Sequence, residues 1–199
     1  MKKESCLKRL AVAALSGVLL AGSAGSGLLM PYVQAEENAM ETVYAFDFEE
    51  GIDGWYYGDG WEYQYNGTLP TVESDTENGR MKITVDFSQD ADKDWSNIAA
   101  CWWSDAGADL TGVTQISMDV WYETDKLTEG ELKIAVYSNC GLDANTSLSD
   151  IQEEDDTGLT RAKAVITCPA ISSNAVQDFA VKIVGCYTGY SGAVWLDNI

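Results

Sequence analysis

One stretch of the sequence places an aromatic ring between carboxylates on the outward side of a strand. Successive side chains of a strand point to opposite faces, so the apolar positions of ISMDVWYE (116–123) share one face and Asp119, Trp121 and Glu123 share the other. An aromatic ring can stack on the apolar face of a sugar ring, and carboxylates can accept hydrogen bonds from its hydroxyls. The pattern therefore indicates sugar binding, and the alternative for Trp121 is a ring that a loop covers.

A second stretch repeats this arrangement. In LKIAVYSN (132–139), Lys133 and Tyr137 lie opposite the aliphatic positions, and Asn139 follows at the end. These side chains combine an aromatic ring with groups that can bond hydroxyls. We expect them to belong to the same ligand-binding face.

The sequence has seven Trp residues, more than a single small core needs. Trp55, Trp102 and Trp195 stand among apolar neighbours and are assigned to the core. Trp61 lies in a Gly- and aromatic-rich stretch, Trp95 follows a charged loop, and Trp103 alternates with Trp102. The predicted ligand-binding residues are Trp61, Trp95, Trp103, Asp119, Trp121, Lys133, Tyr137 and Asn139.

The first 35 residues have the composition of a secretory signal peptide. Lysines and an arginine come first, a small-residue apolar stretch follows, and Val33-Gln34-Ala35 fits the small-x-small cleavage pattern. We expect residues 1–35 to be removed, so that residues 36–199 form one secreted, extracellular domain. Its length is enough for a proper core.

The net charge of the chain is −20 at pH 7. Such acidity disfavours nucleic acids and anionic membranes as partners. It suits a soluble, monomeric protein with a neutral ligand, and it offers many oxygen ligands to a hard cation such as calcium.

Four cysteines follow the predicted signal peptide: Cys101, Cys140, Cys168 and Cys186. Their spacing matches no zinc motif, and the sequence contains no His. An extracellular location permits disulfides, but the sequence leaves their pairing, and the alternative of free thiols, open.

Short alternating stretches separated by turn signals predict an all-β sandwich with few helices. The acidic run 150–156 is expected to be a solvated loop. Strands are expected over 43–48, 61–65, 80–87, 96–103, 114–123, 131–138, 162–167, 178–186 and 193–198.

Both ends of the domain resemble the galactose-binding-like jelly rolls. The opening reads FDFEEGIDGW (46–55) and the last strand reads AVWLDNI (193–199). The interior segments NGRMKITVD (78–86), WSNI (95–98) and DLTGV (109–113) are most similar to carbohydrate-binding module family 27, the mannan-binding module of bacterial β-mannanases.

This resemblance implies a non-catalytic module that binds β-1,4-mannan or galactomannan, as part or relative of a secreted mannan endo-1,4-β-mannosidase. The resemblance also implies a structural calcium that ties the first and last strands together. The matching positions are Glu49 and Asp197, with Asp47 as a further ligand.

The alternative is a small jelly-roll glycoside hydrolase acting on plant cell-wall polysaccharide. Such an enzyme needs two carboxylates about 5–5.5 Å apart for retention or about 6.5–9.5 Å apart for inversion. Asp119 and Glu123 lie four residues apart on one strand, roughly 13 Å at the usual strand rise. A cross-strand pair with Glu131 remains open, but no catalytic site is recognised, which favours the binding module.

Overall fold

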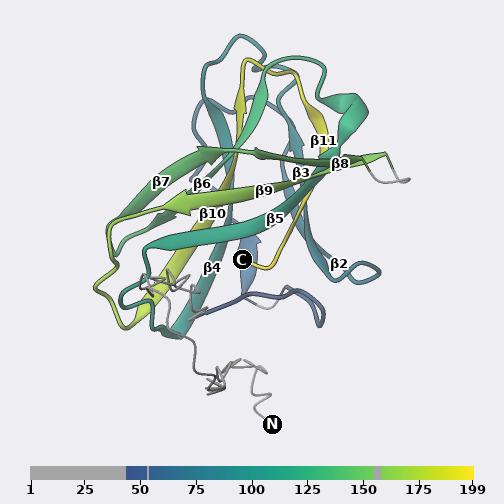
Figure 1. Ribbon diagram of the computed structural model, residues 1–199. Helices are drawn as coiled ribbons and strands as arrows, with labels where there is room; N and C mark the ends of the chain where they lie inside the picture. Colours follow the sequence, from purple (N-terminus) through teal and green to yellow (C-terminus); the bar gives the residue numbers. More distant parts are fainter. Residues whose placement is uncertain (1–43, 53, 155–157) are drawn as a thin grey trace, which may run out of the picture. The chain divides into compact units, whose positions relative to one another are not determined.

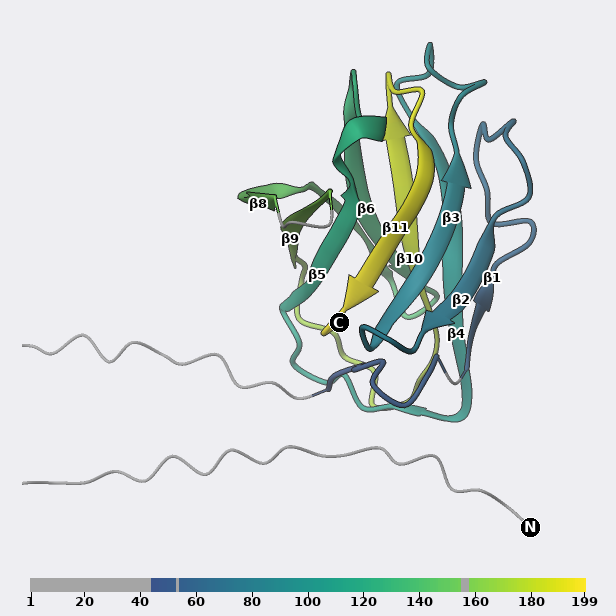
Figure 2. The ribbon, with the colours of Figure 1, turned by 90° about the vertical axis from the view of Figure 1, so that its right-hand side faces the viewer.

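Two antiparallel sheets form the fold of this chain, whose computed structural model describes residues 44–52, 54–154 and 158–199. The β4 sheet runs in the order β1 (Trp55–Tyr57), β4 (Ser96–Ala108), β10 (Val176–Cys186), β6 (Glu131–Ser138) and β7 (Leu142–Ser147). The β5 sheet runs in the order β2 (Thr71–Asp75), β3 (Arg80–Asp86), β11 (Ser191–Asp197), β5 (Gln115–Glu123), β9 (Leu159–Thr167) and β8 (Ser149–Glu154). Figures 1 and 2 show the two sheets as facing layers, with β5, β11, β3 and β2 in front in Figure 2.

The core lies between the inner faces of the two sheets. Met81, Ile83 and Val85 alternate along β3 with half-buried polar residues, and all three belong to the main apolar cluster. Phe179 and Ile183 of β10 belong to the same cluster. This burial of alternate side chains is the dominant favourable contribution to the fold, and it confirms the predicted all-β sandwich.

Aromatic rings close one end of the core. Phe46 packs edge-on against Trp55 and Trp102, with ring centroids 5.1 Å and 5.2 Å apart. Both Trp residues are buried in the main cluster, as predicted. Phe46 also exchanges two backbone hydrogen bonds with Ile199, of 2.8 Å and 3.1 Å, which ties the start of the described chain to its end.

The structure contains the predicted strands over 80–87, 96–103, 114–123, 131–138, 162–167, 178–186 and 193–198, with shifted ends. The predictions over 43–48 and 61–65 were wrong for the described residues, because these segments make isolated pairings, such as the bridge of Tyr63 with Asn97, and no continuous ladder.

Polar edge strands account for most of the strands that the sequence did not predict. Edge strand β7 reads LDANTS and edge strand β8 falls in the acidic run that was expected to be a loop. An edge strand can be rich in charged and polar residues, so its sequence resembles that of a loop.

The assignment of Trp195 to the core was also wrong. Val194 and Leu196 fill the inner face of β11, which leaves Trp195 on the outer face, paired across the strands with Trp121 and near Lys82. The lysine chain covers part of the ring, which explains why an outward Trp is tolerated among apolar neighbours.

The helical structure of the described residues is the 3-10 turn Thr124–Lys126. Among the residues that the structure describes, no helix has the length and hydropathy needed to cross a membrane.

Tyr190 joins β5 to β11 from inside the core. Its hydroxyl accepts a hydrogen bond from the Glu123 amide at 3.2 Å and donates one to the Ala193 carbonyl, and the side chain is fully buried. The Ala193 amide in turn donates to the Glu123 carboxylate at 2.8 Å. The Glu123 amide and the Ala193 carbonyl, which belong to two adjacent central strands, therefore both find their partner in one hydroxyl.

We predict that Tyr190→Phe lowers the free energy of unfolding by about 1–3 kcal/mol, because the Glu123 amide loses a buried acceptor. Urea denaturation would measure the change. Tyr187→Phe is the matched control, since Tyr187 is largely exposed, and its stability should stay within about 0.5 kcal/mol of the parent. Equal effects of the two variants would contradict this account of Tyr190.

Candidate functional site

The outer face of the β4 sheet carries a group of aromatic side chains. Tyr56 on β1 and Trp103 on β4 are about half exposed, at 51% and 49%, and Tyr137 on β6 is half-buried. They point away from the core because Trp55, Trp102 and Val136 beside them point into it. The same alternation that fills the core therefore displays these rings.

Small residues form the floor between these rings. Cys101 pairs with Ala180, which pairs with Tyr137, so the three residues form one row across β4, β10 and β6. Ala99, Cys101 and Ala180 are buried although they lie on the outer face. Burial of short side chains on an outer face requires other atoms above them.

A loop between β1 and β2 supplies those atoms. Gly58 donates its amide to the Ala99 carbonyl at 2.9 Å, and a Cβ at this position would overlap the Cys101 sulfur. Glycine is therefore required where this loop crosses β4. Burial raises the pKa of the Cys101 thiol to about 11, which makes it an inert part of the floor.

Trp61 of this loop lies against Tyr137. Their ring centroids are 5.1 Å apart and the planes are inclined by 75°, an edge-to-face contact. Trp61 is 37% exposed and Tyr63, two residues later, is 55% exposed. The loop thus adds two rings to the same face as Tyr56, Trp103 and Tyr137.

Polar groups lie among these rings. The Lys182 ammonium is 5.7 Å from the centroid of Tyr137. Asp178 accepts hydrogen bonds from the Ser138 hydroxyl at 3.4 Å and from the Asn139 amide at 3.1 Å. These contacts hold the turn after β6 and leave the Asn139 side chain at the rim of the face.

Lys133 occupies the same face nearer to the turn before β6. Its ammonium forms an ion pair with Glu131 at 3.0 Å. The hydrogen bond of this pair lowers the pKa of Glu131 and raises the pKa of Lys133. Lys133 is thus already engaged within the protein.

The structure brings six of the eight predicted ligand-binding residues to this face or its rim. Trp95 packs on Ala135, Val184 and Cys186, which are outward residues of the β4 sheet. The other five are Trp61, Trp103, Lys133, Tyr137 and Asn139. The aromatic and polar groups predicted from separate segments therefore share one surface.

Asp119 and Trp121 lie on the outer face of the other sheet. The guanidinium carbons of Arg80 and Arg161 lie 3.7 Å and 5.4 Å from the ring centroid of Trp121, which is 6% exposed. Arg161 also pairs with Asp119 at 3.2 Å. Trp121 stays outside the core, as its alternation predicts, but two arginines cover it.

Three residues of the face were absent from the predicted set: Tyr56, Tyr63 and Lys182. A signal for Tyr56 existed, because it alternates with the buried Trp55. Tyr63 lies two residues after Trp61 and shares its parity, which was a signal, although its exposure depends on loop geometry. Lys182 alternates with core residues of β10, and only its neighbours in space distinguish it from an ordinary surface lysine.

The predicted calcium ligands lie near the end of β11. Burial raises the pKa of Asp197, and the charges of Asp119 and Glu49 raise it further, so three carboxylates are close enough to repel. Asn198 donates its side-chain amide to Asp197 at 3.1 Å and to Asp119 at 3.2 Å. The Asp47 side chain is exposed.

These contacts partly fit a cation site. Burial is the main cause of the raised pKa of Asp197, and a cation would offset the smaller contribution from the charges of Asp119 and Glu49. The Asn198 amide, however, already bridges Asp197 and Asp119. Among the described residues, no group of three or more Asp, Glu, His or Cys side chains is arranged to hold a metal ion. Calcium at this position would need to displace that amide and recruit carbonyl oxygens.

The cysteines are free thiols across the described residues. Cys140 and Cys168 belong to or pack against the main apolar cluster, whereas Cys101 and Cys186 lie under the aromatic face. The four thiols thus pack as small apolar side chains.

The fold is similar to that of solved carbohydrate-binding modules, although no family model and no curated protein matches the sequence. TmCBM27, studied for specific mannan recognition, superposes with a TM-score of 0.60 and 17% identity, over 77% of this chain and 92% of that one. CBM27-1 of Caldicellulosiruptor saccharolyticus, solved with mannohexaose, gives 0.59 and 18%, over 77% and 93%. CBM28, a module specific for non-crystalline cellulose, gives 0.57 and 16%, over 76% and 90%. The expected resemblance is thus confirmed in three dimensions: the chain has the β-sandwich fold of family 27 and family 28 carbohydrate-binding modules.

Proposed function

We propose that the secreted chain is a non-catalytic carbohydrate-binding module that holds β-1,4-mannan or galactomannan on the outer face of the β4 sheet. The observation that carries this proposal is the cluster of rings on that face, centred on the contact of Trp61 with Tyr137. The module would act as a monomer, as part or relative of a secreted mannan endo-1,4-β-mannosidase.

Exposed rings supply most of the binding energy in this proposal. Each ring that stacks on a sugar contributes on the order of 1–2 kcal/mol. Two or three such rings with a few hydrogen bonds reach about −8 kcal/mol, a micromolar dissociation constant. Trp61, Tyr56, Tyr63 and Trp103 are exposed enough to make such contacts.

Polar groups beside the rings would orient the sugar. Lys182 can donate to hydroxyls, and Asp178, which accepts a hydrogen bond from the Asn139 backbone amide, can accept from them. A face with one central lysine and several carboxylates favours a neutral chain over an anionic one. Mannan is neutral and carries hydroxyls on both edges of the chain.

Two of the similar structures concern mannan and one concerns cellulose. Both polymers are β-1,4-linked and differ in the orientation of one hydroxyl. The sequence motifs favour family 27, and mannan is therefore the proposed ligand.

The positions of the acids support binding over hydrolysis. The sequence left open a cross-strand pair with Glu131, but Asp119 and Glu123 lie on β5 and Glu131 lies on β6 of the other sheet. On the aromatic face, Asp143 lies two strands away from Asp178 and two residues further along the strand direction. The backbone positions of the two acids are therefore roughly 12 Å apart across the sheet. This pair is farther apart than either mechanism of glycoside hydrolysis needs.

We further propose that calcium binds between Glu49 and Asp197, with Asp47 as a third carboxylate. The support is the raised pKa of Asp197, caused first by burial and then by the charges of Asp119 and Glu49. A divalent cation would make the ionised forms of these acids favourable in the folded state. It would also stabilise the pairing of Phe46 with Ile199.

The first test replaces one Trp on each outer face. Trp61→Ala should weaken mannohexaose binding about five- to thirty-fold, the loss of one stacking platform, with little change in melting temperature. Trp121→Ala should keep the affinity but lower the free energy of unfolding by about 2 kcal/mol or more, because two guanidiniums lose the ring beneath them. Titration calorimetry and urea denaturation measure the two quantities.

The reverse result would move the ligand site to the β5 sheet. The parent protein should bind mannohexaose more tightly than cellohexaose, should not bind xylan, and should release no reducing sugar from mannan. Preference for cellohexaose would refute the mannan assignment, and hydrolysis that survives purification would refute the non-catalytic role.

The second test removes calcium. A ligand that binds only the folded state raises stability by mass action, so a chelator should lower the melting temperature and calcium should restore it. Asp197→Asn should abolish this response, whereas Glu50→Gln, a nearby exposed control, should preserve it. If the parent protein shows no response to chelator or calcium, the site does not exist.

The pH dependence adds a check on the same carboxyl. Because the pKa of Asp197 is raised in the folded state, its protonated form favours folding in the calcium-free protein. That contribution is present at acid pH and is lost as the pH rises through the folded-state pKa. Calcium should reduce this loss, and Asp197→Asn should remove it.

A further inference from the structure

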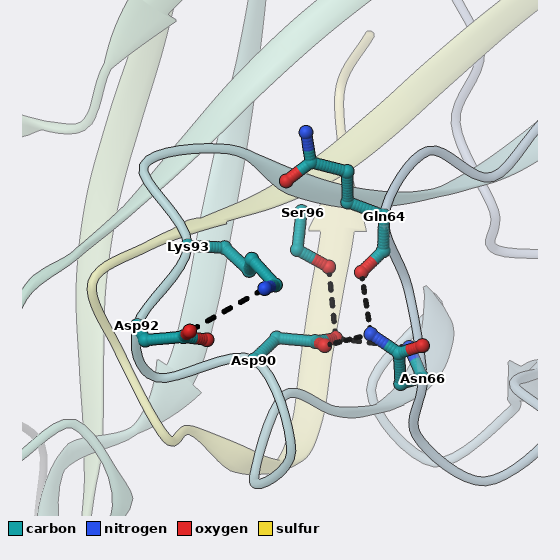
Figure 3. A network of polar contacts seen from close by, with 6 residues as sticks. All are labelled: Gln64, Asn66, Asp90, Asp92, Lys93 and Ser96. Atoms are coloured by element: carbon teal, nitrogen blue, oxygen red, sulfur yellow. Dashed lines mark hydrogen bonds and ion pairs between the residues drawn. The ribbon is translucent and has the colours of Figure 1, made fainter.

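A buried carboxylate lies beneath the loop that carries Trp61 and Tyr63. Asp90 is 1% exposed. Its two oxygens accept hydrogen bonds from the Asn66 side-chain amide at 2.6 Å, from the Asn66 backbone amide at 3.1 Å and from the Ser96 hydroxyl at 3.0 Å (Figure 3). Two of the three donors belong to the loop, so Asp90 holds Asn66 against the sandwich.

Asn66 also stabilises an unfavourable backbone conformation at Gln64. Its side-chain amide donates a second hydrogen bond to the Gln64 carbonyl at 3.0 Å (Figure 3). Gln64 has a φ of 55°, in the left-handed region that non-glycine residues rarely adopt. Asn66 therefore joins this turn to Asp90 through one amide group.

The turn at Gln64 sets the directions of its neighbours. In an extended chain, residues two apart point to the same side. Here Tyr63 is exposed on the aromatic face, whereas Tyr65 packs on the core residue Phe87, with ring centroids 5.7 Å apart. The left-handed residue between them allows one tyrosine to face outward and the other inward.

Trp61 lies between two backbone anchors of the loop. The first is the hydrogen bond of Gly58 to Ala99 at 2.9 Å. The second is the bridge of Tyr63 with Asn97, whose two hydrogen bonds are 3.2 Å and 3.0 Å long. The second anchor directly precedes Gln64, so its geometry depends on the turn.

We propose that Asn66 and Asp90 are positioning residues of the ligand face: they hold the left-handed turn at Gln64 and thereby fix Trp61 and Tyr63 over the β4 sheet. The consequence for sugar affinity rests on the proposed function, whereas the consequence for the position of Trp61 does not. Neither residue needs to contact the ligand.

The test compares two variants that each remove one hydrogen bond to Asp90. Asn66→Ala removes the side-chain amide that joins Asp90 to Gln64 and keeps the bond from the backbone amide of residue 66 to Asp90. Ser96→Ala removes the bond to β4 and leaves every bond of Asn66 in place. The protein is labelled with fluorotryptophan, and Trp61→Phe identifies the Trp61 resonance. Fluorine NMR then reports the position of Trp61 without ligand, and titration with mannohexaose reports affinity.

Asn66→Ala should move or broaden the Trp61 resonance and weaken mannohexaose binding at least five-fold. Ser96→Ala should leave both unchanged, even if its melting temperature falls as much. Adding Gln64→Gly to Asn66→Ala should restore much of both signals, because glycine adopts the left-handed turn freely. Asp90→Asn keeps the shape of the side chain and should change the Trp61 resonance and the affinity in the same direction as Asn66→Ala. It replaces Asn66→Ala in the comparison if that variant folds poorly.

Equal behaviour of Asn66→Ala and Ser96→Ala in both readouts would overturn the proposal, as the network would then act only on stability. An unchanged Trp61 resonance in both Asn66→Ala and Asp90→Asn would overturn it as well. If the parent protein binds no mannohexaose while its Trp61 resonance still responds to Asn66→Ala, the proposed function fails and the positioning role stands.

Discussion

Alternation along the strands is the constraint on which the rest of this structure depends. Each strand can give only every second side chain to the core, and the core takes Phe179, Val181 and Ile183 from β10. The intervening residues must then lie outside, whatever their chemistry. The outer face of the β4 sheet is thus a direct product of how the core is filled.

The aromatic residues of the two outer faces have different neighbours. On the β4 sheet, small residues such as Ala99 and Ala180 leave room for a loop to lay Trp61 against Tyr137. On the β5 sheet, long cationic side chains from β3 and β9 lie over Trp121. Rings on one face remain accessible to a ligand, while rings on the other serve the protein itself.

This difference marks how far the sequence could predict the fold and the site. Alternation correctly separated Trp102 from Trp103 and placed Tyr137 outside the core, because the burial of one face is a local property of a strand. It could not separate Trp121 from Tyr137, since the arginines that cover Trp121 come from β3 and β9, far away in the sequence.

Loop and edge geometry escaped prediction for a related reason. Tyr63 and Tyr65 face opposite sides of the loop across the left-handed turn at Gln64, and no periodicity encodes such a turn at a glutamine. The polar sequence of β7 resembles that of a loop because one side of an edge strand needs no partner. In both cases the deciding contacts join residues distant in the chain.

The covering of Trp121 has a consequence for how such proteins diversify. Two arginine side chains from distant parts of the sequence lie over the indole. A lineage that exchanged both arginines for short residues would uncover a second flat ring on the opposite side of the sandwich. The sandwich would then display aromatic rings on both of its outer faces.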